Sequence, residues 1–374
     1  MRLLADFKPS YAEADRAFVA AAKGAGARLE SFALDLRGPD DELLATRVAH
    51  FGSEDASKLL IVQSGTHGIE GYVGSAAQLG WIREGHQQLP PDVGVLLVHA
   101  INPHGFAWGF RETHERVDLN RNFVDFDRAL PFNDHYAQLH EAFMCPKLTG
   151  PERMAADRDL RLFREQAGEK AFLVALASGQ YIREGGLYYG GTSPTWSNRT
   201  FRGIIEELRP RAKRVAFIDL HSGLGPFGYG MPICMEAAES PGLERTREVF
   251  GASVVAPLAE PDSFIAEIDG HTMGAISRML PEAEVTAIAL EFGTYDTEND
   301  TTTYRDILWL RDHGEWDSPI GQQVRAAFLE HFCPADEGWR EMTWLRAQQV
   351  MRQALSALSA SPDSTRRFSI ANRE

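Results

Sequence analysis

His67 and Glu70 lie three residues apart in the glycine-rich stretch Ser64 to Gly71. Glycine removes steric limits on the backbone, so both side chains can turn toward one point. Imidazole nitrogen and carboxylate oxygen are both good ligands of Zn²⁺. Such a pair also occurs often by chance on a solvated helix, so it does not establish a metal site by itself.

His221 strengthens this interpretation because it directly follows the apolar run Val215 to Leu220. Two histidines and one carboxylate form the ligand set of hydrolytic zinc sites, which leave a further position open for water. The alternative is a histidine at a strand end that hydrogen-bonds a neighbouring loop. For Asp219 two roles stay open: it either faces a helix layer or supports the site as a carboxylate partner of a ligand.

Glu291 ends another apolar run, Val285 to Leu290. A carboxylate in such a place loses hydration free energy unless it is paired or used, which favours a role in proton transfer. An ordinary ion pair is the alternative interpretation.

The turn-rich region Asn102 to Phe123 contributes Arg111, Asn120 and Arg121. A guanidinium group is a planar fork that suits carboxylates and developing oxyanions. Taken singly, arginines of this kind are more often surface ion-pair partners.

The elements that must position these side chains are apolar strands. The runs Leu59 to Val62 and Val93 to Val98 flank a helix-compatible stretch, Gly74 to Arg83, in the pattern of a βαβ unit with buried parallel strands. Arg214 to Leu220 and Glu284 to Leu290 indicate two more buried strands. Ligands bind near the carboxyl ends of strands in open α/β sheets, and His67, His221 and Glu291 follow three such ends.

The remaining pattern predicts further elements in one domain of residues 1–374. Ser178 to Thr200 is rich in Gly, Ser and Tyr and indicates an ordered, irregular loop near the site. We expect a polar tail over Ser359 to Glu374. Further helices are expected at Tyr11 to Gly24, Pro319 to Phe332 and Trp339 to Leu358, and further strands at Leu29 to Leu34 and Leu43 to Phe51.

Composition excludes several classes of function. The chain has 374 residues, of which 44% are hydrophobic and 24% charged, as in ordinary globular proteins. A net charge of -15 argues against binding to nucleic acid phosphates or to an anionic membrane surface. Three widely spaced cysteines and the absence of a leader or apolar span indicate a cytoplasmic protein. No GxSxG turn follows a strand, which argues against a serine hydrolase.

Taken together and in order, these motifs resemble the M14 zinc carboxypeptidase superfamily, and more closely its branch DUF2817. The resemblance is strong over Lys58 to Tyr295, and the stretches Ser64 to Ser75, Gly179 to Asn198 and His221 to Gly230 are similar to DUF2817 in particular. The motifs are His67-x-x-Glu70, Asn102-Pro103-x-Gly105, Arg111, Asp118 to Phe123, Leu220-His221-Ser222, and Glu291 with Gly293 and Thr294.

The resemblance implies a three-layer α/β/α fold with a mixed, largely parallel sheet of about eight strands. It implies one zinc ion on His67, Glu70 and His221, with a second metal left open. It also implies that Glu291 is the general base. By the same resemblance Arg111 polarises the scissile carbonyl, and Asn120 and Arg121 hold a terminal carboxylate of the substrate.

One residue of the carboxypeptidase pattern is missing. Ser263 to Met279 has no counterpart of the tyrosine that carboxypeptidases place before the catalytic glutamate. His271 or Tyr229 is a candidate to replace it in substrate binding, and the alternative for each is a structural or lid residue.

The function that follows is hydrolysis of an amide bond in a peptide, as by a carboxypeptidase. An aspartoacylase-like deacylase acting on N-acyl amino acids is the alternative, because Asn120 and Arg121 suit a carboxylate in both substrates. A non-catalytic binding module is a third possibility, although no expected ligand or base is lost. The oligomeric state is left open.

Overall fold

The computed structural model describes residues 3–86, 89–260, 263 and 265–360. These residues contain a seven-stranded sheet with the strand order β1-β2-β4-β3-β5-β7-β6. Its strands are β1 (Arg28–Arg37), β2 (Leu43–Phe51), β3 (Lys58–Ser64), β4 (Val93–His99), β5 (Arg214–Gly223), β6 (Gly230–Ile233) and β7 (Glu284–Gly293).

The sheet is mixed, with a parallel centre. Strands β4, β3, β5 and β7 run parallel, whereas β1, β2 and β6 join antiparallel at the two edges. The expected mixed, largely parallel sheet is therefore confirmed, with seven strands close to the expected eight. The six strands expected from apolar runs are all present within a few residues of the expected bounds.

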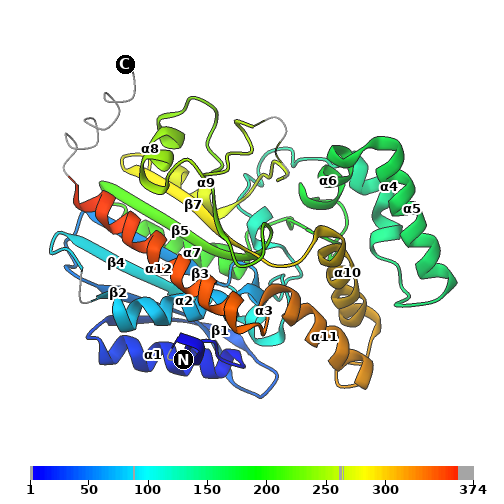
Figure 1. The fold of residues 1–374 in the computed structure, drawn as a ribbon, viewed down its shortest axis with the longest axis horizontal. Helices are drawn as coiled ribbons and strands as arrows, with labels where there is room; N and C mark the ends of the chain where they lie inside the picture. Colours follow the sequence, from blue (N-terminus) through cyan, green and yellow to red (C-terminus); the bar gives the residue numbers. More distant parts are fainter. Residues whose placement is uncertain (1–2, 87–88, 261–262, 264, 361–374) are drawn as a thin grey trace.

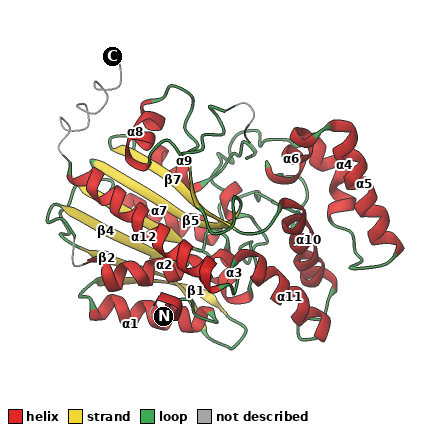
Figure 2. Cartoon of the chain, viewed as in Figure 1, coloured by secondary structure: helices red, strands yellow, loops and turns green. Residues whose placement is uncertain are grey.

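Helices cover both faces of the sheet, which confirms the three-layer arrangement (Figure 2). Alternate strand residues face opposite layers: Leu60 and Val62 of β3 pack on one side, and Leu59 and Ile61 on the other. The first layer contains α1 (Tyr11–Gly24), α2 (Gly71–Glu84), α8 (Pro241–Phe250) and α12 (Glu337–Ser359), and the second contains α7 (Trp196–Leu208) and α9 (Thr272–Met279).

A further group of helices lies beyond one end of the sheet (Figure 1). These helices share their own apolar cluster, which includes Tyr136, Phe172, Tyr304 and Phe328. They are α4 (Asp134–Phe143), α5 (Pro151–Ala167), α6 (Glu169–Ala177), α10 (Thr297–His313) and α11 (Pro319–Phe332). Short elements complete the chain: η1 (Leu3–Asp6), η2 (Gly68–Glu70), α3 (Pro103–Trp108) and η4 (Leu119–Arg121).

The expected helices α1, α11 and α12 are confirmed. Residues 361–374 of the expected polar tail lie outside the described residues. In the described part of the chain, no helix combines the length and apolar character needed to cross a membrane.

Candidate active site

Three adjacent parallel strands bring the candidate residues to one edge of the sheet. β3 leads through Gly65, which has a φ of 70°, into the short helix η2, so that His67 and Glu70 follow the strand directly. His221 on β5 and Glu291 on β7 are partners in the strand register. Side chains at paired positions emerge on the same face, so these two lie side by side.

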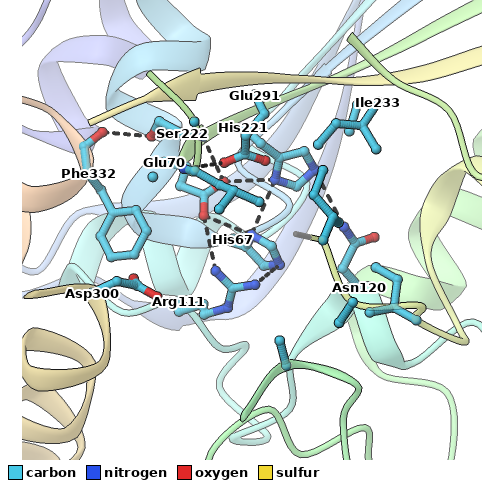
Figure 3. A pocket seen from close by; sticks show the side chains of 18 of the residues that line it. His67, Glu70, Arg111, Asn120, His221, Ser222, Ile233, Glu291, Asp300 and Phe332 are labelled. Carbon is cyan, nitrogen blue, oxygen red and sulfur yellow. Dashed lines mark hydrogen bonds and ion pairs between the residues drawn. The ribbon is translucent and has the colours of Figure 1, made fainter. Parts of the chain in front are cut away.

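Three buried side chains converge on one point (Figure 3). Glu70 Oε1 lies 2.8 Å from His67 Nδ1, and Glu70 Oε2 lies 2.8 Å from His221 Nδ1. The two Nδ1 atoms are 3.2 Å apart. All three side chains are nearly inaccessible, with 4% or less of each residue exposed. One nitrogen of each histidine and the carboxylate thus face a common centre.

Each histidine directs its other ring nitrogen at an aspartate. His67 Nε2 is 3.3 Å from Asp118 Oδ1, and His221 Nε2 is 3.0 Å from Asp219 Oδ2. A carboxylate behind a histidine fixes its tautomer and leaves the opposite nitrogen free to bind a metal. Of the two roles left open for Asp219, the structure therefore gives it the one beside the site.

The electrostatics of this cluster also fit a cation. Burial alone would raise the pKa of Glu70, but the neighbouring His67 and His221 hold it below its usual value. Burial would lower the pKa of His221, yet Asp219 and Glu70 raise it well above its usual value. Carboxylates therefore dominate around His221, and a divalent metal can take the place of its proton. Donor types, spacing and charge thus suit a metal such as zinc.

Glu291 is partly exposed to the cavity beside this cluster. The surrounding protein raises its pKa to about 7 by desolvation, and the negative charge of Glu70 adds to the effect. Its Oε1 accepts a hydrogen bond of 3.2 Å from the backbone N–H of Leu224. A carboxylate with a pKa near neutrality is suited to accept and release a proton.

Arg111 is directly attached to the cluster. Its Nε donates to Asp118 Oδ2 at 2.9 Å, and its Nη1 donates to Glu70 Oε1 at 3.2 Å. Its Nη2 lies 2.9 Å from His67 Nε2. The guanidinium is buried, and Asp118 and Glu70 fix its position.

Asn120 and Arg121 lie on η4 at the same cavity. Asn120 Oδ1 accepts from the N–H of Thr272 at 3.0 Å, which fixes the side chain near His221. Arg121 Nη1 donates to the Asn120 carbonyl at 3.0 Å, and Nη2 donates to the carbonyl of Ala177.

Tyr229 and His271, the expected substitutes for the missing tyrosine, do not line the cavity. Tyr229 is 39% exposed, and the guanidinium of Arg346 lies 5.6 Å from its ring centre. His271 is the N-cap of α9 and accepts a hydrogen bond from the N–H of Gly274 at 2.9 Å. Packing and helix capping therefore explain both residues in this structure.

The cavity has a volume of about 520 Å³. Figure 3 shows the His67, Glu70 and His221 cluster at its middle, with Asn120 on one side and Asp300 on the other. Apolar side chains from several elements form much of its wall: Leu173 and Leu176 of α6, Ile233 of β6, Ile265, Ile268, Met273 of α9 and Ala289 of β7.

Sequence reasoning did not single out two residues of this site. Asp118 belonged only to a longer motif, and its contact with both His67 and Arg111 depends on the fold. Tyr188, which lines the cavity, lay within a Gly- and Tyr-rich stretch whose composition signalled a loop but no particular side chain.

Comparison with a solved structure shows a carboxypeptidase-like α/β fold. Bovine thrombin-activatable fibrinolysis inhibitor, solved in complex with tick carboxypeptidase inhibitor, is 12% identical over 93% of this chain and 96% of that chain, with a TM-score of 0.51. Carboxypeptidase A from Helicoverpa armigera is 13% identical over 86% of this chain and 73% of that chain, with a TM-score of 0.46. At 12% identity, the likeness to the bovine protein concerns the fold alone.

The particular family follows from the sequence. The family model described as "Protein of unknown function (DUF2817)" matches residues 7–346, so the chain belongs to the DUF2817 family. The expected DUF2817 membership is confirmed. No curated protein matches the chain.

Proposed function

We propose that the chain is a zinc-dependent hydrolase of amide bonds, with the metal held by His67, Glu70 and His221. The observation that carries this proposal is the convergence of three buried donors whose metal-binding atoms lie within 4.8 Å of one another beside Glu291. A bound zinc ion would act as a Lewis acid toward the substrate carbonyl and would lower the pKa of water.

The chain's own residues supply the proton transfers. Glu291 accepts a proton from the attacking water and delivers it to the leaving nitrogen, a role that a pKa near 7 suits. With His67 Nδ1 used for the metal, Nε2 carries the ring proton and donates a hydrogen bond to Asp118. A protonated Nε2 cannot accept from Arg111 Nη2, so this donor becomes available to the substrate oxygen.

Arg121 supports a substrate with a free carboxylate. It is 4% exposed, its Nε has no hydrogen-bond partner, and it forms no direct ion pair with the described residues, the nearby charge of Asp118 being shared with Arg111. A buried cation without a direct ion-pair partner is unfavourable, so an anionic group of the ligand is its natural partner. Peptides with a free C-terminus and N-acyl amino acids both carry this group.

We place carboxypeptidase activity first and deacylation of N-acyl amino acids second. The apolar walls of the cavity accept a side chain or an acyl group, and the carboxylate at Arg121 is common to both substrates. For the compartment, three free, buried cysteines support the reducing cytoplasm.

The test combines metal analysis with a substrate panel. The purified protein should hold one zinc ion per chain, and the zinc-loaded protein should hydrolyse either C-terminal residues of peptides or N-acyl amino acids. Glu291→Gln should keep the metal and lose about 10² to 10⁴ in rate, because the amide cannot accept the proton. A Glu291→Gln variant that works within a few-fold of wild type at full zinc occupancy would contradict the mechanism.

A further inference from the structure

The loop between α6 and α7 lies against the cavity and has no role in the mechanism above. Its two limbs are joined by hydrogen bonds from Gln180 N to the Tyr188 carbonyl at 3.2 Å and from Gly190 N to the Gln180 carbonyl at 2.8 Å. Asp118 N donates to the Tyr189 carbonyl at 2.7 Å. The loop is thereby fixed to the segment that carries Asp118.

Tyr188 has an unusual backbone conformation within this loop. Its φ is 51°, in the left-handed region that side chains other than glycine seldom adopt. The residue is 6% exposed and lines the cavity. A disfavoured conformation at a buried residue of a cavity wall indicates that the position of its side chain matters.

The ring of Tyr188 faces both arginines of the candidate site. The guanidinium carbon of Arg111 lies 4.8 Å from the ring centre, and that of Arg121 lies 5.2 Å from it. Tyr304 supports the ring edge-on, with centres 5.2 Å apart and an angle of 88° between the planes. Two like charges can therefore stay close together because an aromatic ring stabilises both.

The hydroxyl of Tyr188 has no hydrogen-bond partner among the described residues. Burial raises the pKa of Tyr188, with a smaller contribution from Asp300, so the hydroxyl stays protonated and can donate. The hydroxyl oxygen does not belong to the fully buried unpaired atoms, so it is open to the cavity, where a ligand oxygen can accept its hydrogen bond.

We propose that Tyr188 is a substrate-binding and positioning residue: its hydroxyl donates to an oxygen of a carboxylate-bearing substrate, while its ring holds Arg111 and Arg121 in place. This inference rests on the proposed function. It also identifies Tyr188 as the tyrosine that takes part in substrate binding here, in place of Tyr229 or His271.

The two roles can be separated by substitution. Tyr188→Phe removes the hydroxyl and keeps the ring, whereas Tyr188→Leu removes both. The probe is N-acetyl-L-leucine, titrated by calorimetry into zinc-loaded Glu291→Gln protein so that no turnover occurs. We expect binding to weaken about 10-fold in Tyr188→Phe, the size of a hydrogen bond to a charged group. Tyr188→Leu should weaken it about 10-fold further through loss of the cation–π contacts.

Tyr189→Phe is the matched control, because this neighbouring tyrosine does not line the cavity. It should bind the probe as the parent protein does, and Tyr188→Phe should keep the zinc content and melting temperature of the parent. In the wild-type background, Tyr188→Phe should raise KM more than it lowers kcat.

Distinct outcomes separate this inference from the proposed function. Binding by Tyr188→Phe within twofold of the parent, an equal loss in Tyr189→Phe, or no binding by the parent would overturn the role of the hydroxyl. Equal binding by Tyr188→Leu and Tyr188→Phe would overturn the role of the ring. Failure of the wild type to hydrolyse any substrate would instead count against the proposed function, and the calorimetry would still decide the role of Tyr188.

Discussion

Asp219 shows how much a metal site depends on residues behind its ligands. It accepts hydrogen bonds of 2.6 Å from the hydroxyls of Thr66 and Thr272 and contacts His221 Nε2 at 3.0 Å. Because Asp219 is itself held rigidly, it fixes the ring of His221. Asp219→Asn should therefore lower zinc affinity about 10- to 100-fold, measured by competition with a chelator. Asp92→Asn, at an exposed ion pair with Lys58, should leave it unchanged.

Arg111 and Arg121 should give different kinetic defects. Arg121→Ala should mainly raise KM for substrates with a free carboxylate, because the buried cation that binds this group is lost. Arg111→Ala should mainly lower kcat, by about 10²-fold, because it removes a donor to the charge that develops in the transition state. Steady-state kinetics on a peptide acid and on its amide distinguish the two. Wild-type kinetics in both variants would remove these arginines from the mechanism.

At the scale of elements, the central strands could be predicted because they are buried on both faces. The core of β3 is the apolar run Leu59–Val62, and β5 and β7 are mostly apolar up to His221 and Glu291, which follow directly. β6 has only four residues, one of them Pro232, so no strand pattern is visible in the sequence. Helices α4, α5 and α6 were likewise not expected, and α6 lines the cavity with Leu173 and Leu176.

The sequence predicted the site residues at strand ends but not those placed by loop packing. His67, Glu70, His221 and Glu291 belong to motifs at strand ends, so their convergence could be expected once the strands were recognised as parallel. The partnership of Asp118 with His67 and the place of Tyr188 between two arginines come from loop packing. No local pattern of residue types encodes such contacts, because they join segments distant in the sequence.

Close approach between η2 and α3 gives an element-scale prediction. A Cβ on Gly68 would lie 2.0 Å from the backbone carbon of Gly105, so one of the two elements must move. Gly68→Ala should destabilise the fold by roughly 1 to 3 kcal/mol and lower zinc affinity, since Glu70 lies on the same short helix.

Gly203 offers the matched control for that substitution. It is exposed in the interior of α7, and a Cβ there meets no atom within 4 Å. Gly203→Ala should therefore stabilise the protein by roughly 0.5 to 1 kcal/mol, because alanine loses less backbone entropy in a helix. Urea unfolding measures the stability of both variants. If Gly68→Ala had the same free energy of unfolding and the same zinc affinity as wild type, the close approach of η2 and α3 would not matter for either.

At the scale of the whole molecule, buried histidines link folding to pH. The pKa values of His50, His99 and His104 are each lowered to about 4, with burial as the largest cause. Their usual pKa is 6.5, so between pH 6.5 and 4 the unfolded chain binds more protons than the folded one. The free energy of unfolding contributed by these residues is therefore fully present above pH 6.5 and is lost as the pH falls toward 4.

His99 is the best residue on which to measure this linkage. It is completely buried at the end of β4, its ring stacks on Phe18 at 4.4 Å, and its Nε2 lies 2.9 Å from Ser75 Oγ. A shift of this size corresponds to roughly 2 kcal/mol of stability lost between pH 7 and 4.5. In His99→Gln, which keeps a polar group near Ser75, the fall in stability over that pH range should be smaller than in wild type by about this amount. His114→Gln, at a less buried histidine, should change the pH dependence much less.

Urea unfolding of wild type, His99→Gln and His114→Gln at pH 7 and 4.5 provides the comparison. An unchanged pH dependence of the free energy of unfolding in His99→Gln would show that His99 is not the source of the acid sensitivity.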